Sequence, residues 1–444
     1  MFKPLLYSTL LVALCAQVHA ADLLESWRAA RAHDAAFSAS GHALAAGQEK
    51  AQQARALLLP QVSLATAASL AQKNVLPGDP SATRSSAQGP HYGATLALLQ
   101  PLYDANTAAA REQLQLQTKQ AQLQYRVAEQ ELMLRVATAY FELLLAQENV
   151  RLVQAQQQAV ARQLAQAEKT FSIGAGTQAD TSEARARYDA IAASAIAVRN
   201  ELELKQAAYQ QMTQLDAQSL APLSTAHVPP GPQPATLAPW LDQARSHSLA
   251  ALAQAIELEL AQSEVARYLS ERSPSVALVA NVGTQWDSNG PAHSAWLDRS
   301  NARSIGVQLS IPLYDGGNRS SQWREAVERA AQQGDALEAG VQAAQLATRQ
   351  SFLGMQSGAA QVKALEQATR SSATLVASSI MGRDVGVRTT VDVLNAQQVH
   401  FQNLYNLQAL RYQYLLSSLQ LEASVGQLTQ DQLASVNRWL SAAP

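Results

Sequence analysis

The sequence is poor in cysteine and in aromatic residues, and each shortage excludes a familiar kind of fold. Only one cysteine occurs among the 444 residues, and Phe, Trp and Tyr together make up 5%. A single thiol cannot form a disulfide framework, and so few aromatic side chains do not suit a bulky globular core. Alanine and glutamine are abundant instead, which is typical of long helices that approach one another closely.

The cysteine, Cys15, lies in a segment with the features of a secretory signal peptide. Lys3 supplies a positive start, an apolar stretch follows, and Val18-His19-Ala20 offers small side chains at a cleavage site. We therefore expect residues 1–20 to be removed, which leaves a mature chain without cysteine. A lipoprotein would be cleaved just before the cysteine, a position that normally needs a small residue where this chain has Leu14.

Long apolar runs and an excess of one charge are also lacking. The net charge is −2, so the chain shows no polyanion-binding signature and nucleic acid is not an expected partner. Arg135 and Glu142 interrupt the best apolar stretch beyond the signal, so no helix is expected to span a membrane. An exported chain of this kind could still enter an outer membrane as a β-barrel, in which neighbouring strands satisfy the backbone.

No motif indicates catalysis, a cofactor or a metal. A nucleophile elbow, a phosphate-binding loop and a His-Glu-x-x-His zinc motif are missing, and the histidines are scattered at spacings that match no metal site. Charged pairs such as Glu183 with Arg187 have the i, i+4 spacing of helix-surface ion pairs. We therefore expect a protein that is not an enzyme and that holds neither cofactor nor metal.

Three short motifs recur in the same order, each about 212 residues further along the chain. The matching pairs are Leu57–Leu64 with Glu271–Leu278, Gln100–Asp104 with Ile311–Asp315, and Ile173–Asp180 with Val385–Asp392. The shared order and spacing indicate a tandem duplication, and a proline-rich stretch marks its seam. The expected parts are a first repeat (21–221), a linker (222–239), a second repeat (240–428) and a C-terminal segment (429–444).

Each repeat is expected to begin with a helix, at about 23–59 and 237–269, followed by two strands. The strands are expected at about 60–70, 91–101, 274–286 and 303–312. These segments alternate between an apolar side and a side of small or polar residues, which is the period of a strand. Their pattern and length suit a membrane wall between lipid and water, although each pair alone fits a soluble β-hairpin equally well. Four strands cannot close a membrane barrel, so a barrel would require several chains.

Long helices are favoured by two stretches without proline, 102–221 and 313–443. In the first stretch the only glycines, Gly174 and Gly176, divide a rising helix from a returning one. The rising helix would be roughly 100 Å long at 1.5 Å per residue. Its apolar positions between Leu143 and Phe171 alternate in steps of three and four, the stripe of a coiled coil. The expected hairpins, at about 104–221 and 315–428, must therefore pack laterally on neighbours.

Several motifs resemble the TolC family of trimeric outer-membrane channel-tunnels for efflux and type I secretion, and the resemblance covers essentially the whole mature chain. The most specific are the run Gly386–Ala396 and the tail Tyr412–Leu416 with Gly426-Gln427-Leu428 after it. Paired Pro-Leu-Tyr-Asp motifs would mark strand-to-helix junctions, at Pro101, Tyr103 and Asp104 and at Pro312, Tyr314 and Asp315. The resemblance implies an internally duplicated α+β membrane protein with four strands per subunit. Three subunits would form a 12-stranded β-barrel continued by a long α-helical coiled-coil barrel in the periplasm. The linker and the C-terminal segment would form an equatorial belt around it.

The resemblance also implies a periplasmic tip that closes the channel. The helix turns at this tip would lie at Gly174, Gly176 and Gly386. Asp180 and Arg388 match residues that link the closed tip, and Arg383 stands where close relatives have a tyrosine in the same network.

A pore constriction is implied beside this latch. Asp392 matches a pore-facing carboxylate, whereas Asn395 stands where close relatives have a second one. Three Asp392 carboxylates around one axis would attract cations, and a neutral Asn395 would weaken cation block. From the residues alone, Asp180 and Asp392 also fit the first turn of a helix, and Arg388 fits a solvated surface charge.

The implied function is export of small molecules or proteins across the outer membrane, as the outer component of a tripartite efflux or type I secretion system. The implied partners are two further copies of the chain, a periplasmic adaptor, outer-membrane lipid, and an inner-membrane ABC or proton-driven transporter. Two alternatives remain open. A periplasmic adaptor would have a single helical hairpin in a mostly β body, and a structural coiled-coil protein would not need the alternating strands.

Overall fold

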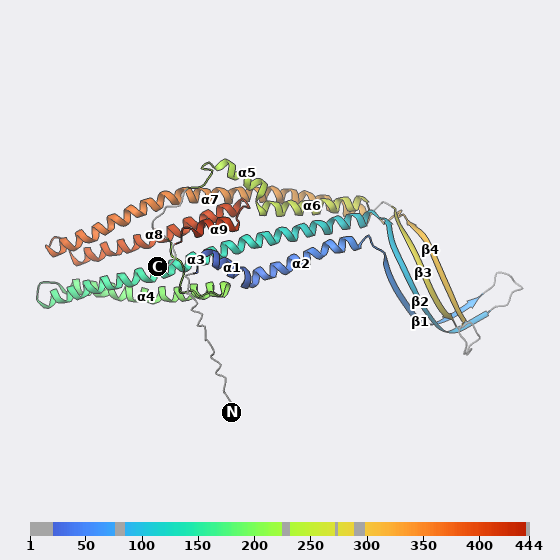
Figure 1. Cartoon of the computed structure of the whole chain (residues 1–444), viewed down its shortest axis with the longest axis horizontal. Coiled ribbons are helices and arrows are strands. Elements are labelled where there is room, and N and C mark those ends of the chain that lie inside the picture. The colour runs from blue at the N-terminus through green and yellow to red at the C-terminus, as the bar shows by residue number, and fades with distance from the viewer. Residues whose placement is uncertain (1–20, 76–84, 224–230, 271–273, 288–297, 441–444) are drawn as a thin grey trace, which may run out of the picture. The chain divides into compact units, whose positions relative to one another are not determined.

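The computed structural model describes residues 21–75, 85–223, 231–270, 274–287 and 298–440 (Figure 1). The expected signal peptide, part of the linker and the last four residues lie outside this range. The first half contains α1 (Leu23–His33), α2 (Ala35–Ala56), β1 (Gln61–Val75), β2 (Ser85–Tyr103), α3 (Ala105–Ser172) and α4 (Gln178–Thr213). The second contains α5 (Leu237–His247), α6 (Leu249–Ser270), β3 (Ser275–Asp287), β4 (Asp298–Ser310), α7 (Asn318–Asp384), α8 (Thr390–Ser424) and α9 (Gln430–Asn437).

The two halves form matching series of elements. α1 and α5 have 11 residues each, and α2 and α6 have 22 each. The rising helices α3 and α7 have 68 and 67 residues, and the returning helices α4 and α8 have 36 and 35. None of the helices in the described ranges combines the length and the apolar character needed to cross a membrane.

The single helix expected at the start of each repeat is wrong, because it is broken at corresponding positions. The N–H of Asp34 donates to the carbonyl of Ala30 (2.7 Å) and ends α1, while its carboxylate accepts from the N–H of Phe37 (2.7 Å) and caps α2. Ser248 separates α5 from α6, and its N–H donates to the carbonyl of Ala244 (3.3 Å). A short polar side chain that bonds the nearby backbone competes with continuation of the helix, which apolar periodicity does not report.

The strands form one antiparallel sheet in the order β1-β2-β3-β4. β1 and β2 run beyond the expected ends, and their pairing extends from Gln61 opposite Leu99 to Val75 opposite Ser85. β4 likewise begins at Asp298, before the expected start at 303. These extensions carry many polar residues, so they lack the apolar alternation from which the strands were predicted.

The chain divides into two compact units, each built from both repeats. One unit comprises Met1–Gly41, Arg126–Ala250 and Val341–Pro444, and it contains both helix turns, α1, α4, α5, α8 and α9. The other comprises His42–Tyr125 and Ala251–Gly340, and it contains the sheet with the adjoining parts of α2, α3, α6 and α7.

The core of the first unit is centred on Tyr140 of α3, which is fully buried. Its hydroxyl donates to the carbonyls of Ala21 (3.2 Å) and Ala221 (2.8 Å), two segments that also form a short bridge beside it. Tyr209 of α4 lies nearby and bonds Ser26 of α1 through its hydroxyl (2.6 Å). Burial raises the pKa of Tyr140 far above its usual value, so the hydroxyl stays protonated and remains a donor. The N-terminal segment, α1, α3 and α4 are therefore held together at one point.

Candidate functional site

Both helical hairpins turn at a glycine in the left-handed region. Gly174 follows α3 with φ +75°, and Gly386 follows α7 with φ +80°. Helices commonly end at such a glycine because other residues meet a steric penalty there. Gly176 has no positive φ, but a Cβ there would approach the backbone of Phe171 at 3.1 Å. All three expected turn glycines therefore have a structural reason at these turns.

A threonine and an aspartate bond each other at the start of each returning helix. The N–H of Asp180 donates to Thr177 Oγ1 (3.1 Å), and the Thr177 hydroxyl donates to the Asp180 carboxylate (2.7 Å). In α8, the N–H of Asp392 donates to Thr389 Oγ1 (3.1 Å), and the N–H of Thr389 donates to Asp392 Oδ2 (2.8 Å). The pair in α8 forms a capping box, whereas in α4 the backbone N–H of Thr177 does not bond the aspartate. Both aspartates lie in the first turn of their helix, the position that they also fit from sequence.

The capping contacts keep Asp392 charged. The N–H and hydroxyl of Thr389, together with the guanidinium of Arg388, hold the pKa of this carboxyl below its usual value. Its side chain is 38% exposed. The carboxylate is therefore ionised at neutral pH and accessible to solvent.

Arg388 and Asp180 are not brought together within a chain. Arg388 Nη1 lies 3.9 Å from Asp392 Oδ1, whereas the carboxylate of Asp180 bonds Thr177. The arginine lies over Gly382 of α7, where a Cβ would come within 2.7 Å of its Cγ. The expected pairing of Arg388 with Asp180 therefore stays a prediction for the assembled protein.

Arg383, the other expected latch residue, connects the two hairpins. Its Nη1 donates to Gln163 of α3, and its Nη2 donates to the carboxylate of Asp384 (2.7 Å). Gln163 is buried, and the Arg383 side chain is only 19% exposed. The charge therefore lies at a contact between α7 and α3.

A second arginine connects the hairpins and was not recognised from sequence. Arg187 of α4 donates to Gln398 (2.6 Å) and Asn395 (3.2 Å), both on α8, and to Glu183 on its own helix (2.9 Å). The i, i+4 spacing predicted only the contact with Glu183. Since the α8 partners lie more than 200 residues away in sequence, no local pattern could indicate them. Within the described ranges, Arg187 is the only residue whose side chain bonds the side chain of Asn395, an expected constriction residue.

A small apolar cluster packs beneath the Arg187 contacts. Its buried members are Val160 and Ala167 of α3, Ala184 of α4 and Leu394 of α8. Val160 and Ala167 belong to the stripe predicted on α3, so this stripe contacts both the returning helix and the second hairpin. The hairpins therefore meet through both apolar and polar contacts near their turns.

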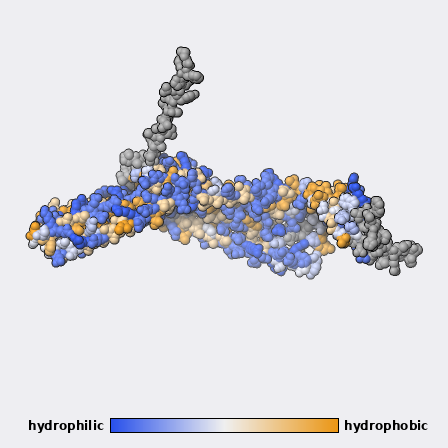
Figure 2. All heavy atoms as spheres, turned by 90° about the horizontal axis from the view of Figure 1, so that it is seen from below, coloured by the Kyte–Doolittle hydropathy of each residue, from blue (hydrophilic) through white to orange (hydrophobic). Residues whose placement is uncertain are grey.

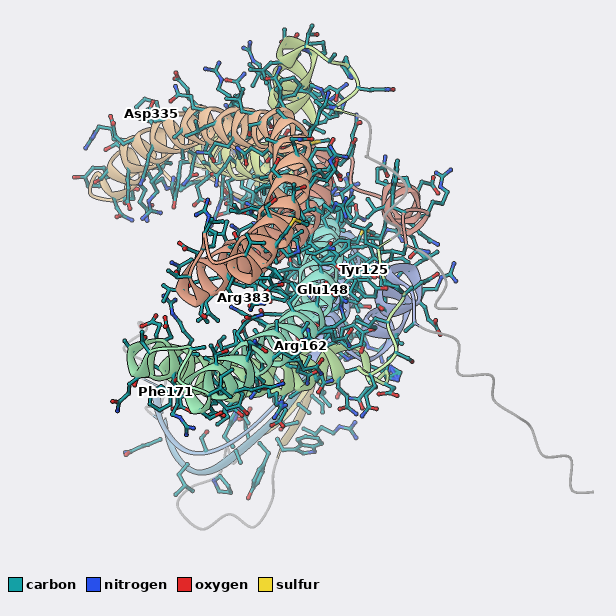
Figure 3. All side chains as sticks on the ribbon, turned by 90° about the vertical axis from the view of Figure 1, so that its left-hand side faces the viewer. Tyr125, Glu148, Arg162, Phe171, Asp335 and Arg383 are labelled. Atoms are coloured by element: carbon teal, nitrogen blue, oxygen red, sulfur yellow. The ribbon has the colours of Figure 1, made fainter. Side chains whose placement is uncertain are left out.

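Large apolar side chains are exposed at the turns themselves. Ile173, Val385 and Val387 are each at least 70% exposed, and Phe171 and Met381 are also exposed. Figure 2 shows hydrophobic side chains at this end of the hairpins, and Figure 3 views it end-on, with Phe171 on one hairpin and Arg383 on the other. Such a concentration of exposed apolar residues marks an interaction surface.

The sheet has two chemically different faces. Residues that pair across an antiparallel sheet point to the same side, so the register defines the rows. One row of partners is Leu64, Leu96, Val282 and Arg303, and the next row is Ala65, Thr95, Gly283 and Ala302. We call the side with the first row the apolar face and the other the small-residue face.

The strand-to-helix junctions combine an aromatic residue with a helix-capping aspartate. An irregularity between Pro101 and Tyr103 makes Tyr103 the partner of Val276, which moves the tyrosine onto the apolar face. The Asp104 carboxylate accepts from the N–H of Asn106 (3.0 Å) and starts α3. In the second repeat, Pro312 lies between β4 and α7, Tyr314 is 90% exposed, and Asp315 accepts from the N–H of Arg319 (2.9 Å).

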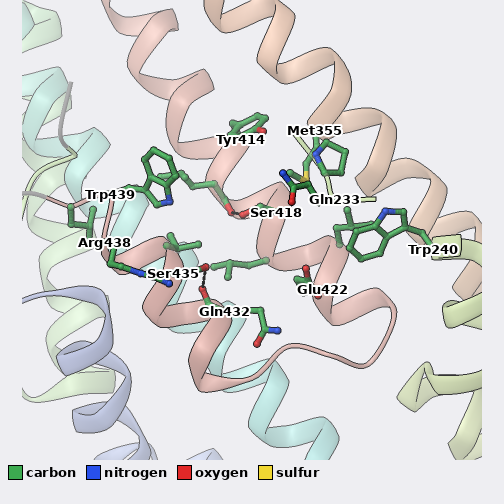
Figure 4. A pocket seen from close by; sticks show the side chains of 16 residues that line it. Gln233, Trp240, Met355, Tyr414, Ser418, Glu422, Gln432, Ser435, Arg438 and Trp439 are labelled. Carbon is green, nitrogen blue, oxygen red and sulfur yellow. Dashed lines mark hydrogen bonds between the residues drawn. The ribbon is translucent and has the colours of Figure 1, made fainter. Parts of the chain in front are cut away.

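A cleft of about 670 Å³ lies in the first unit (Figure 4). Its walls include Gln233 of the expected linker and Trp439 of the expected C-terminal segment, so these distant segments lie together. Trp240, Tyr414 and Glu422 complete much of the lining, and burial raises the pKa of Glu422. Within the described ranges no group of His, Cys, Asp or Glu could hold a metal ion. One carboxylate among aromatic side chains indicates packing or binding rather than acid–base chemistry.

Comparison with known proteins gives matches along nearly the whole chain. The family model described as "Outer membrane efflux protein" matches residues 27–215 and 240–427. The chain is 29% identical to the outer membrane protein TolC of Vibrio cholerae, over 99% of this chain and 98% of that protein. It is 26% identical to the proteases secretion protein PrtF of Dickeya chrysanthemi, over 100% and 96%. The crystal structure of the outer membrane protein VceC from Vibrio cholerae aligns with a TM-score of 0.75 at 20% identity, covering 91% of this chain and 96% of that one.

Proposed function

Because this chain belongs to the outer membrane efflux protein family, we propose that three copies of it assemble into one export channel whose entrance is gated at the hairpin turns. The protein is a transport component of the outer membrane with a large periplasmic part, and it is not an enzyme.

The single observation that carries the assembly is the open four-stranded sheet. β1 and β4 are its two edges, and a sheet edge exposes backbone groups that require a partner. Its apolar face is also uncovered, with Leu64 69% and Val307 65% exposed. If β4 of each copy pairs with β1 of the next, three copies close a barrel that leaves no edge and turns the apolar faces to lipid.

The cargo is a small molecule or a protein delivered by an inner-membrane transporter through a periplasmic adaptor. The matching family model is described as an outer membrane efflux protein, and one relative is named a proteases secretion protein, so efflux and protein secretion both have precedent among similar chains. The adaptor binds the hairpin turns, where Ile173, Val385 and Val387 offer apolar contact. A proton-driven transporter would indicate efflux of small molecules, and an ABC transporter would indicate protein secretion.

The gate works by separating the two hairpins. Arg187 and Arg383 hold α4 to α8 and α7 to α3, close to Asn395 and Asp392 of the proposed constriction. Asp180 and Arg388 form the latch between copies. The Arg388 guanidinium is 53% exposed within one chain and Asp180 is partly exposed, so both can be reached by a neighbouring copy. Release of these contacts widens the entrance.

Membrane fractionation and planar-bilayer recording test the assembly. We expect the full-length protein in the outer-membrane fraction, as a trimer that dissociates only on heating, and we expect discrete conductance steps after reconstitution. A monomer that remains outside the outer-membrane fraction, or a trimer without conductance, would contradict the proposal. Cross-linking from Val387→Cys, with an exposed control cysteine at Leu204 away from the turns, would identify the adaptor and its transporter. Equal capture from both positions would rule out docking at the turns.

A further inference from the structure

We propose that the apolar face of the sheet carries a binding site for a phosphate-bearing lipid headgroup at the end away from the helices. The site consists of Arg299 and Arg303 of β4, beside Trp286 and Tyr92. It rests on the proposed assembly, in which this face meets lipid, and it adds a ligand that the export function does not require.

The strand register places these four side chains on one face. Arg303 is the partner of Val282, and Arg299 is the partner of Trp286, which in turn pairs with Tyr92. Val282 belongs to the apolar face, and positions two and four residues along a strand stay on the same side. Both arginines are therefore attached to the side that carries leucine, valine and isoleucine nearer the helices, with Asn301 and Thr284 in the row between the two arginines.

The arginines lie where the apolar residues of this face end, on the side away from the helices. Along β4, Leu309, Val307 and Ile305 come first, then Arg303, and finally Arg299. For a strand tilted by about 40°, a rise of about 3.3 Å per residue puts Arg303 about 15 Å and Arg299 about 25 Å above Leu309. Since the apolar band of a membrane barrel is about 25 Å tall, Arg299 reaches the headgroup level, and Arg303 can extend its long side chain towards it.

Aromatic residues lie at both ends of the apolar face. Tyr92 and Trp286 share the row of Arg299, and Tyr103 lies at the other end of the same face because of the irregularity in β2. Aromatic girdles are expected at both interfaces of a membrane barrel. The aromatic residues Tyr92 and Trp286 therefore lie beside the two positive charges, whereas Tyr103 lies at the junction with the helices.

Neither arginine has a carboxylate partner in the described part of the chain. Arg299 lies over the ring of Trp286 (5.8 Å) and donates to Thr284 (3.3 Å), and these contacts leave its charge uncompensated. The apolar-face rows of all four strands contain no aspartate or glutamate, whereas Asp287 pairs with His91 on the small-residue face. Two unneutralised guanidinium groups at a lipid interface complement an anion, and guanidinium binds phosphate through two parallel hydrogen bonds.

The orientation of the chain identifies the lipid. With the helices in the periplasm, the end of the sheet away from them lies in the outer leaflet. The ligand is therefore an outer-leaflet lipid whose headgroup carries phosphate, and not a phospholipid of the inner leaflet or free phosphate in solution.

A binding assay on the purified trimer tests this site. The probes are diphosphorylated lipid A and its dephosphorylated form, and the variants are Arg299→Gln/Arg303→Gln and the control Arg324→Gln, which removes an exposed arginine of α7. A positive charge near an anionic lipid surface is worth about a fivefold effect on binding, so the double variant should lose roughly thirtyfold in affinity for the phosphorylated lipid. The control should bind like the parent, and the dephosphorylated lipid should not distinguish the three proteins.

Conductance separates failure of this site from failure of the assembly. If the double variant forms the trimer and conducts like the parent but binds phosphorylated lipid equally well, the lipid site is wrong and the channel assignment stands. If it changes ion selectivity without changing lipid affinity, the arginines face the pore and the site is again wrong. Loss of trimer and conductance in the parent itself would instead contradict the proposed assembly.

Discussion

Replacement of Arg187 by methionine tests most directly the proposed gate between the two hairpins. The variant keeps an unbranched side chain on α4 and removes the two hydrogen bonds to α8, at 2.6 Å to Gln398 and 3.2 Å to Asn395. Hydrogen bonds from a charged donor contribute about 1.5–3 kcal/mol each when shielded. Because the Arg187 side chain is 36% exposed, solvent reduces this to about 0.5–1 kcal/mol each. The contact between hairpins is then worth about 1–2 kcal/mol, or roughly a 5- to 30-fold shift towards the open state.

Single-channel recording in planar bilayers measures that shift as an increase in open probability or mean conductance. Arg185→Met is the matched control, because Arg185 lies on the same helix but pairs with Glu168 of its own hairpin (2.6 Å). Combining Arg187→Met with Gln398→Leu should add little beyond the first change, since both remove the same bond. Parent-like conductance in Arg187→Met, or an equal increase in Arg185→Met, would refute the assignment.

Three further changes test the constriction and the folded core. Asp392→Asn should keep the helix cap and weaken block of the channel by multivalent cations. Because the pKa of Asp392 is lowered, its charge is present at neutral pH and is lost only as pH falls through that lowered value. Block of the parent should therefore persist from pH 8 to 5, and a midpoint above pH 6 would exclude this carboxylate. Gly426→Ala should destabilise the protein by about 3 kcal/mol or more, because Gly426 has φ +72° and its added Cβ would collide with a backbone carbonyl. The control Gly334→Ala places a Cβ in open space within α7, so it should be neutral or stabilise the protein by about 0.5–1 kcal/mol. Similar denaturation midpoints for both variants would contradict this account. Tyr140→Phe should lower the free energy of unfolding by about 1–3 kcal/mol, because the buried carbonyl of Ala221 loses the hydroxyl donor and that of Ala21 keeps only the N–H of Ala221. Urea denaturation measures the change, and an unchanged midpoint would show that these bonds do not stabilise the core.

Much of the chain layout was predictable because its signals are local. The proline-free stretches became helices of 67 and 68 residues, and their returns lie at Gly174 and Gly386, as expected. The recurring motifs predicted a duplication, and the two halves contain elements of similar length in the same order. The resemblance drawn from the tip and tail motifs is confirmed by the family match over both halves. The breaks at Asp34 and Ser248 were missed, since a capping side chain does not change the apolar period of the helices on either side.

The site was predictable only in part. A place in the first turn of a helix was one of two interpretations that Asp180 and Asp392 allowed, and both lie there in the single chain. Their roles in a latch and a constriction stay predictions, because those roles depend on contacts between copies. Arg187 was assigned only to helix-surface support, since its spacing to Glu183 is local and its α8 partners are not.

The sequence by itself determined the duplicated order of elements, the long helices, their turns and the alternation of the strands. Each depends on interactions among residues a few positions apart, where proline, glycine, capping side chains and apolar period act directly on the backbone. Only the tertiary structure decided which arginines connect the two hairpins, how the irregularity in β2 turns Tyr103 towards the apolar face, and that Arg299 and Arg303 share this face with Trp286. These outcomes depend on the register and packing of segments from both repeats, and the energies involved exist only once those segments meet.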